Sequence, residues 1–177
     1  MRIITGSLKG RRIHIPNTLD VRPTSDRTKE GLFSAIESRI YIQETRVLDL
    51  FAGSGNLGFE AISRGASNVL FVDNDRRNIR LIEKTADQFR VASQIRTVTS
   101  AVEDFLQGPA MPYDLIFSDP PYDYPLMQEM VDVILAKGWL QENGLFILEH
   151  DKRHDFSGHD RCMFSKAYGR TTVSIFM

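Results

Sequence analysis

Short apolar runs alternate with longer stretches of helical spacing along most of this chain. Each run rich in valine, isoleucine, leucine and phenylalanine predicts a buried strand, and apolar residues three or four positions apart predict a helix. Predicted strands cover residues 46–50, 69–73, 94–99, 114–118, 145–149 and 171–176. Predicted helices cover residues 24–40, 56–64, 75–90 and 125–137. This alternation is typical of an α/β fold, in which helices cover both faces of a mostly parallel sheet.

Residues 1–16 form a separate basic segment that contains no acid. Ile3-Ile4-Thr5 and residues 12–15 alternate like two short strands around Gly6 and Gly10, which predicts a β-hairpin. Its cations are Arg2, Lys9, Arg11 and Arg12, with Arg22 and Arg27 following soon after. Two interpretations stay open from the residues alone, namely contact with nucleic-acid phosphates and a charged edge exposed to water.

A glycine-rich loop follows the predicted strand 46–50. Glycines at 53, 55 and 58 allow the backbone to approach a ligand closely and to aim N–H groups at it, as in folds that bind adenosine cofactors. The next strand ends in Asp73, where such folds place an acid against the ribose hydroxyls. Asp49, just before the glycines, would repel a pyrophosphate and suits a cationic cofactor. The sequence therefore favours S-adenosylmethionine over NAD.

Residues 118–122 read Ser-Asp-Pro-Pro-Tyr directly after an apolar strand. The two prolines stiffen the backbone and lack N–H groups, so the loop presents mainly acceptors. The Asp119 carboxylate and the Pro120 carbonyl can accept the two hydrogens of an exocyclic amine, and the Tyr122 ring offers a face for a stacked base. The alternative is an ordinary proline-rich turn, because short motifs have many false positives.

Composition narrows the classes of protein. The chain has 177 residues and is 42% hydrophobic, which suits one core and a single domain over residues 1–177. No apolar run is long enough to cross a bilayer, and one cysteine, Cys162, cannot form an internal disulfide, so we expect a cytoplasmic protein. The net charge of −1 requires any affinity for RNA to come from a local patch.

The motifs together resemble a known family. The loop from Gly53 to Gly58 with Asp49 resembles the cofactor motif of class I S-adenosylmethionine-dependent methyltransferases, and Asp119-Pro120-Pro121-Tyr122 looks like the motif of their amino-methylating members. The opening Met1–Gly6, the basic residues 9–12 and the run Arg22-Pro23-Thr24-Ser25-Asp26-Arg27 resemble the RsmD-type family. These are bacterial guanine-N2 methyltransferases of small-subunit ribosomal RNA, and the resemblance covers the whole chain.

The resemblance implies a role for each matching residue. It implies the Rossmann-like class I methyltransferase fold with an added N-terminal hairpin, S-adenosylmethionine as cofactor, and small-subunit ribosomal RNA or the assembled small subunit as partner. The implied substrate-contacting residues are Asp119, Pro120 and Tyr122. The implied cofactor-binding residues are Asp49, Phe51, Gly53, Gly55, Asp73 and Ser100. The implied RNA-binding residues are Arg2, Lys9, Arg11, Arg12, Arg22 and Arg27.

Several alternatives remain at this point. Ser100 aligns where relatives place an acid against the adenine amine, so Asp104 or a backbone group competes for that contact. The Pro-Pro motif also serves adenine-N6 and glutamine-N5 targets. An NAD-dependent oxidoreductase would explain the glycines and Asp73, and a non-catalytic RNA-binding protein would explain the basic segment. We expect no metal, because the His150–Cys162 segment matches no compact zinc spacing.

Overall fold

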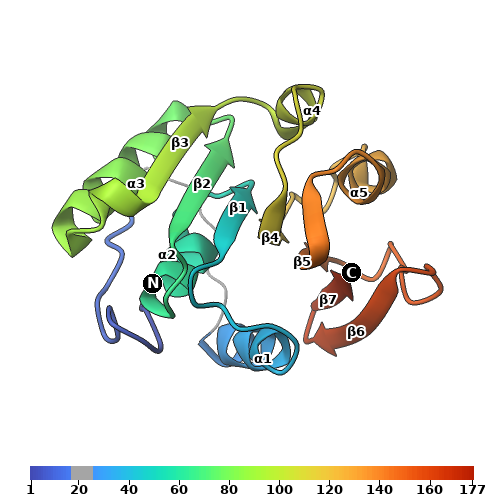
Figure 1. The fold of residues 1–177 in the computed structure, drawn as a ribbon, viewed down its shortest axis with the longest axis horizontal. Helices are drawn as coiled ribbons and strands as arrows, with labels where there is room; N and C mark the ends of the chain where they lie inside the picture. The colour runs from blue at the N-terminus through green and yellow to red at the C-terminus, as the bar shows by residue number, and fades with distance from the viewer. Residues whose placement is uncertain (17–25) are drawn as a thin grey trace.

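The structure is a computed structural model, and it describes residues 1–16 and 26–177. One sheet of seven strands forms its centre, with the order β3-β2-β1-β4-β5-β7-β6 (Figure 1). The strands are β1 (Arg46–Leu50), β2 (Asn68–Asp73), β3 (Ile95–Thr99), β4 (Tyr113–Ser118), β5 (Leu140–His150), β6 (Cys162–Tyr168) and β7 (Thr171–Phe176). The helices are α1 (Asp26–Glu37), α2 (Asn56–Ser63), α3 (Arg76–Phe89), the 3-10 turn η1 (Ala92–Gln94), α4 (Val102–Leu106) and α5 (Met127–Ala136).

The first five strands run parallel, and β7 inserts antiparallel between β5 and β6. Parallel neighbours need a crossover on the face of the sheet, and the helices supply it. The order of the strands reverses between β1 and β4, because the chain first moves outward to β3 and then returns to β4. In sheets of this kind the ligand lies outside the carboxyl ends of the strands at that reversal.

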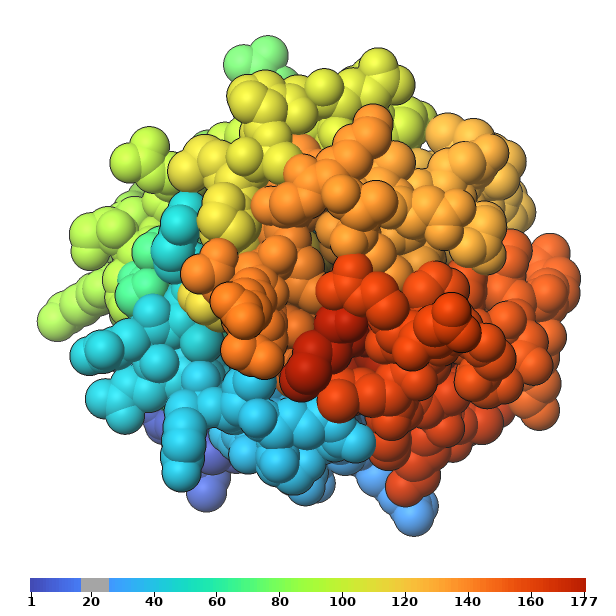
Figure 2. Space-filling model, turned by 45° about the vertical axis from the view of Figure 1, so that its right-hand side comes forward, coloured from blue at the N-terminus to red at the C-terminus, as the bar shows by residue number. Residues whose placement is uncertain are grey.

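Two apolar layers bury the sheet on both faces. Helices α1, α2 and α3 cover one face, where Phe33 packs against Phe117 of β4 and Phe59 against Phe71 of β2 (Figure 1). Helices α4 and α5 cover the other, where Val131 packs with Ile116. The space-filling view shows the C-terminal strands, in orange and red, directly beside the blue residues of α1 (Figure 2). The predicted α/β class is therefore confirmed.

The basic N-terminal segment forms the predicted hairpin and is fastened to α2. Arg2 and Arg12 form an antiparallel bridge, the Ile3 N–H donates to the carbonyl of Arg11 at 2.9 Å, and the Ile13 N–H donates to that of Met1 at 2.9 Å. The pairing covers residues 1–3 and 11–13, a shorter stretch than the two predicted strands. Gly6 has φ +85°, and a Cβ there would lie 1.7 Å from the carbonyl oxygen of Ser63. Only glycine allows this close approach of the loop to α2.

The predicted N-terminal helix 24–40 is found as α1, which is described over Asp26–Glu37 and so ends before the predicted boundary. Residues 24 and 25 lie outside the described residues. Across the described residues, no helix combines the length and the apolar character that crossing a bilayer requires.

Candidate active site

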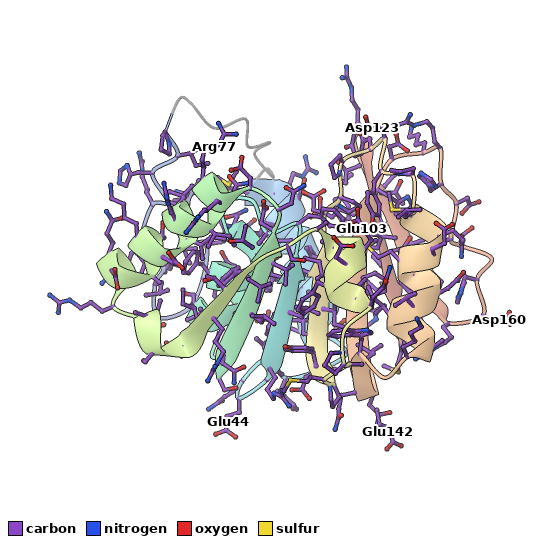
Figure 3. All side chains as sticks on the ribbon, turned by 90° about the horizontal axis from the view of Figure 1, so that it is seen from above. Glu44, Arg77, Glu103, Asp123, Glu142 and Asp160 are labelled. Atoms are coloured by element: carbon purple, nitrogen blue, oxygen red, sulfur yellow. The ribbon has the colours of Figure 1, made fainter. Side chains whose placement is uncertain are left out.

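A cavity of about 950 Å³ opens at the carboxyl ends of the central strands. Asp49 comes from β1, Asp73 from the end of β2, Asp119 from the loop after β4 and Glu103 from α4, and all four line it. Figure 3 shows Glu103 on the same edge of the sheet as Asp123, with Glu44 and Glu142 at the opposite edge. The structure thus brings together the three aspartates that the sequence placed at strand ends.

Two of these carboxylates hold the glycine loop in place. The Gly53 N–H donates to Asp73 Oδ2 at 2.8 Å, and the Gly58 N–H donates to Asp49 Oδ2 at 3.0 Å. The Gly55 N–H donates to the carbonyl of Ala52 at 2.7 Å. The expectation that these N–H groups point at the ligand is therefore wrong, because all three are satisfied within the protein. These three N–H groups are therefore not available to a phosphate.

The cavity is strongly acidic. Among the described residues that line it there are four carboxylates and no lysine, arginine or histidine. Burial raises the pKa of Asp49 well above its ordinary value, and the nearby charges of Asp119 and Asp73 raise it further, against the opposing hydrogen bond from Gly58. A bound cation would relieve this repulsion, whereas a pyrophosphate would add to it. The lining therefore fits a cationic cofactor and disfavours NAD.

Gly55 is required by the packing of α2 and α3. Gly55 has φ +75°, and a Cβ there would lie 2.9 Å from the ring of Phe59 and 3.1 Å from Ile82. Gly53 is part of the cavity wall, but Gly55 is not among the described residues that line it. The predicted contact of Gly55 with the cofactor is thus corrected to a turn that lets α2 begin against its neighbours.

The proline loop is held from two sides at Tyr122. Its hydroxyl lies 2.8 Å from Thr171 Oγ1 on β7, and its carbonyl accepts a hydrogen bond of 2.8 Å from Arg153 Nη2. Asp119, Pro120 and Tyr122 all line the cavity. The loop is thus fixed by β7 and by the segment after β5, with its acceptors beside the cofactor space. Neither anchor was expected from the sequence.

A second aromatic residue on this loop was missed by the sequence reasoning. Tyr124 lines the cavity, and its hydroxyl donates to Glu103 Oε2 at 3.2 Å. Burial, followed by the charge of Glu103, raises the pKa of Tyr124 to about 12, so the hydroxyl stays a donor. Phe51, which was predicted to contact the cofactor, lies edge-on to Tyr124 with ring centroids 5.0 Å apart. These side chains connect α4 to the proline loop across the cavity.

Ser100 directly follows β3, and its predicted contact with the cofactor stays a prediction. Its Oγ donates to the carbonyl of Ala101 at 2.9 Å, and it is not among the described residues that line the cavity. Ala101, Val102 and Glu103 line the cavity there instead.

A buried ion pair between Lys29 of α1 and Glu60 of α2 holds the N-terminal segment in place. The Lys29 ammonium donates to the Arg2 carbonyl at 2.6 Å, to Asn56 Oδ1 at 2.8 Å and to Glu60 Oε2 at 3.1 Å. Glu60 also accepts from the N–H of Ile4 at 2.9 Å. Burial lowers the pKa of Lys29, and Glu60 opposes that shift. Because Asn56 lines the cavity, this network ties the basic segment to the cofactor site.

The predicted RNA-binding residues fall into two groups. Arg2 forms an ion pair with Asp26 at 2.7 Å, and Arg11 donates to the carbonyl of Gln88 at 3.0 Å, so these two hold the segment in place. Lys9, Arg12 and Arg27 are exposed. Arg22 lies outside the described residues. Arg2 and Arg11 are exposed as well, so the two groups differ in their partners within the protein and not in their exposure.

The C-terminal histidines are not assembled for metal binding in the described part of the chain. No group of three or more possible ligands is found in residues 1–16 and 26–177. His150 instead lies with Nε2 2.9 Å from Ser174 Oγ and Nδ1 2.9 Å from the carbonyl of Asp151.

The fold and the acidic cavity define a class I S-adenosylmethionine-dependent methyltransferase. The same fold occurs in an RNA methyltransferase from Salinibacter ruber in complex with S-adenosyl-L-homocysteine, with a TM-score of 0.68, 12% identity and coverage of 88% of this chain and 92% of that one.

The chain belongs to the family described as Conserved hypothetical protein 95, whose model matches residues 1–177. It is 36% identical over 155 residues to ribosomal RNA small subunit methyltransferase D of Haemophilus influenzae, covering 86% of this chain and 79% of that protein. The structure of a hypothetical protein from Thermus thermophilus matches with a TM-score of 0.82 and 29% identity, over 99% of this chain and 98% of that one.

Proposed function

We propose that this protein transfers the methyl group of S-adenosylmethionine to the exocyclic N2 amine of a guanine in small-subunit ribosomal RNA. The observation that carries the proposal is the acidic cavity with Asp119 and Pro120 in its wall. A cation-accepting cofactor space and a pair of amine acceptors share one cavity, as direct methyl transfer to an amine requires. The names of relatives such as that of Haemophilus influenzae support ribosomal RNA as the substrate.

Different lining residues suit different parts of the cofactor, according to their chemistry. Asp73 accepts from the Gly53 N–H at Oδ2, and from the Asp75 N–H and the Asn78 side chain at Oδ1, so one lone pair on Oδ2 is left for a ribose hydroxyl. Asp49 provides negative charge for the sulfonium and the amino group. When bound, S-adenosylmethionine supplies an electrophilic methyl group. The chain itself provides the acidic surroundings that hold this group and exclude phosphate-bearing cofactors.

The proline loop orients the amine. Asp119 Oδ and the Pro120 carbonyl accept its two hydrogens, so that the nitrogen lone pair faces the methyl group. The N–C bond forms as the C–S bond breaks, and the positive charge that develops on nitrogen is stabilised by the Asp119 carboxylate, which then accepts the released proton or passes it to water. Orientation of the two reactants can contribute about 7–11 kcal/mol to lowering the barrier.

The target guanine must leave its base pair, since N2 lies on the pairing edge. An unpaired loop avoids most of the unstacking cost of a few kcal/mol, and the Tyr122 ring replaces part of the lost stacking. Thr171 holds the Tyr122 hydroxyl and Arg153 holds the Tyr122 backbone carbonyl, so the residue is ordered before the base arrives. The exposed cations Lys9, Arg12 and Arg27 are placed to contact phosphates of the surrounding RNA.

The proposal is tested by mapping the methylated nucleosides of ribosomal RNA from cells that lack this protein. We expect one N2-methylguanosine to disappear from the small-subunit RNA and to return with the wild-type gene, but not with Asp119→Ala. Loss of an N6-methyladenosine would show that the target base is wrong. An unchanged set of nucleosides, with a methylated glutamine missing from a protein, would assign the enzyme to the protein-modifying alternative.

A further inference from the structure

A second cleft, of about 310 Å³, lies between the N-terminal segment and α3. His14 and Pro16 form one wall, and the exposed residues Arg80 and Lys84 form the other. Its floor includes Leu81, which is 7% exposed. The cleft therefore has an apolar base between polar walls.

The charged side chains among the described residues that line the cleft are all positive. Arg77, Arg80 and Lys84 are spaced three and four residues apart, which places them along one face of α3. Among the described residues that line the cleft there is no carboxylate. Arg77 is paired with Asp75 at 2.6 Å, so Arg80 and Lys84 contribute the charge that is left for a ligand. This is the opposite of the acidic cavity, which would repel a phosphate.

The two sites share α3 and the turn before it. Asn74 and Asn78 line the acidic cavity, whereas Arg77 lines the basic cleft. Figure 3 shows Arg77 on the same edge of the sheet as Glu103 and Asp123. The cleft thus opens beside the active site.

The N-terminal wall of the cleft is fixed to α3. The Arg11 guanidinium donates to the carbonyl of Gln88 at 3.0 Å and lies 5.6 Å from the centre of the Phe89 ring. Since Gln88 also lines the cleft, Arg11 holds the segment at the width observed. A ligand would meet a preformed site and would not have to order it.

We propose that this cleft binds the phosphodiester backbone of the substrate RNA beside the target nucleotide. The inference rests on the proposed function and extends the RNA contact from the N-terminal segment to α3. Because the acidic cavity admits the base but repels phosphate, the backbone next to the base needs a cationic surface nearby. Arg80 and Lys84 supply it, and the apolar floor at Leu81 accommodates a sugar.

The test measures the salt dependence of binding to a fragment of small-subunit ribosomal RNA. The double variant Arg80→Gln, Lys84→Gln is compared with wild type, and Arg96→Gln, Lys137→Gln is the matched control. The control removes one arginine and one lysine that are also exposed, on β3 and at the end of α5. Thermal unfolding and S-adenosylhomocysteine binding are measured for each protein.

The logarithm of the association constant falls linearly with the logarithm of the salt concentration. We expect this slope to become shallower by about one unit for each phosphate contact removed, so by about two units in the cleft variant. The control should keep the wild-type slope, and all three proteins should bind S-adenosylhomocysteine equally. A cleft variant with the wild-type slope, or a control whose slope changes as much as that of the cleft variant, would overturn this inference and leave the proposed function standing. Failure of the wild-type protein to bind or methylate the RNA would overturn the proposed function and the inference with it.

Discussion

Replacing Gly58 by alanine tests how the glycine loop is built. A Cβ at Gly58 would lie 2.2 Å from Cε1 and 2.6 Å from Cζ of Phe71, and 3.0 Å from Asp49 Oδ2. Phe71 is fully buried and packs against Phe59 with ring centroids 5.3 Å apart, so it has no free space to move into. The alanine must therefore push α2 away from β2 or displace Asp49.

The change in the free energy of unfolding follows from two opposing effects. Alanine favours a helix over glycine by about 1 kcal/mol. Overpacking of a filled core costs about 1–3 kcal/mol. Because the added carbon would lie 2.2 Å from a buried ring, we expect a cost at the upper end of this range. We expect a net loss of about 2 kcal/mol in the free energy of unfolding, which lowers the melting temperature by about 4–8 °C for a chain of this size. Cofactor affinity should fall as well, because Asp49 lines the cavity.

Thermal unfolding and calorimetric titration with S-adenosylhomocysteine measure both effects. The matched control is Gly158→Ala, because a Cβ at Gly158 meets nothing within 4 Å. We expect the control to stay within about 0.5 kcal/mol of wild type and to bind the cofactor product normally. A Gly58→Ala protein that is as stable as wild type and binds equally well would refute the packing argument.

Three further predictions concern charge and position. Because its pKa is raised, Asp49 holds its proton to a higher pH than an ordinary carboxyl group, so the affinity for S-adenosylmethionine should rise with pH as Asp49 ionises. Calorimetry should show that Asp49→Asn abolishes this pH dependence. An unaltered pH profile in the variant would exclude Asp49 as a source of negative charge for the cofactor. Lys29→Met should cost about 3 kcal/mol in urea unfolding, the lower end of the range for breaking a buried ion pair, because buried Glu60 loses one cationic partner and keeps the other, Arg64. Adding Glu60→Gln should recover part of the loss, and a single variant as stable as wild type would contradict this. Tyr122→Phe should lose a hydrogen bond of about 1 kcal/mol and lower kcat several-fold, as should Thr171→Val; full activity of both would show that the anchor is dispensable.

The central strands could be predicted from the sequence to within a residue or two. The apolar runs at 46–50, 69–73 and 114–118 match β1, β2 and β4 closely. These strands are covered by helices on both faces, so nearly all their positions must be apolar, and the signal is unbroken.

The missed elements lack such a signal. β6 (Cys162–Tyr168) lies at the edge of the sheet and exposes most of its residues, so its sequence is mixed. Helix α4 has 5 residues, too few for a periodic pattern. β5 begins at Leu140, earlier than the apolar run at 145–149, because its first residues are largely exposed.

The candidate site was predictable where strand topology fixes it. Parallel strands bring their carboxyl ends to one edge, so Asp49, Asp73 and Asp119 had to converge. Their hydrogen-bond partners were not predictable, because the glycine N–H groups had two possible acceptors, the ligand and the protein. The contact of Glu60 with Ile4 joins residues 56 positions apart, and no local pattern records it.

The central claim is that Asp119 orients an RNA amine for methyl transfer within the acidic cavity. The most direct measurement is single-turnover methyl transfer to small-subunit ribosomal RNA by wild type and Asp119→Ala, followed by digestion to nucleosides. We predict N2-methylguanosine as the product of the wild-type enzyme, and a rate lower by about 10²-fold or more in the variant at unchanged cofactor affinity. Transfer at the wild-type rate by Asp119→Ala, or a product other than N2-methylguanosine, would contradict the account.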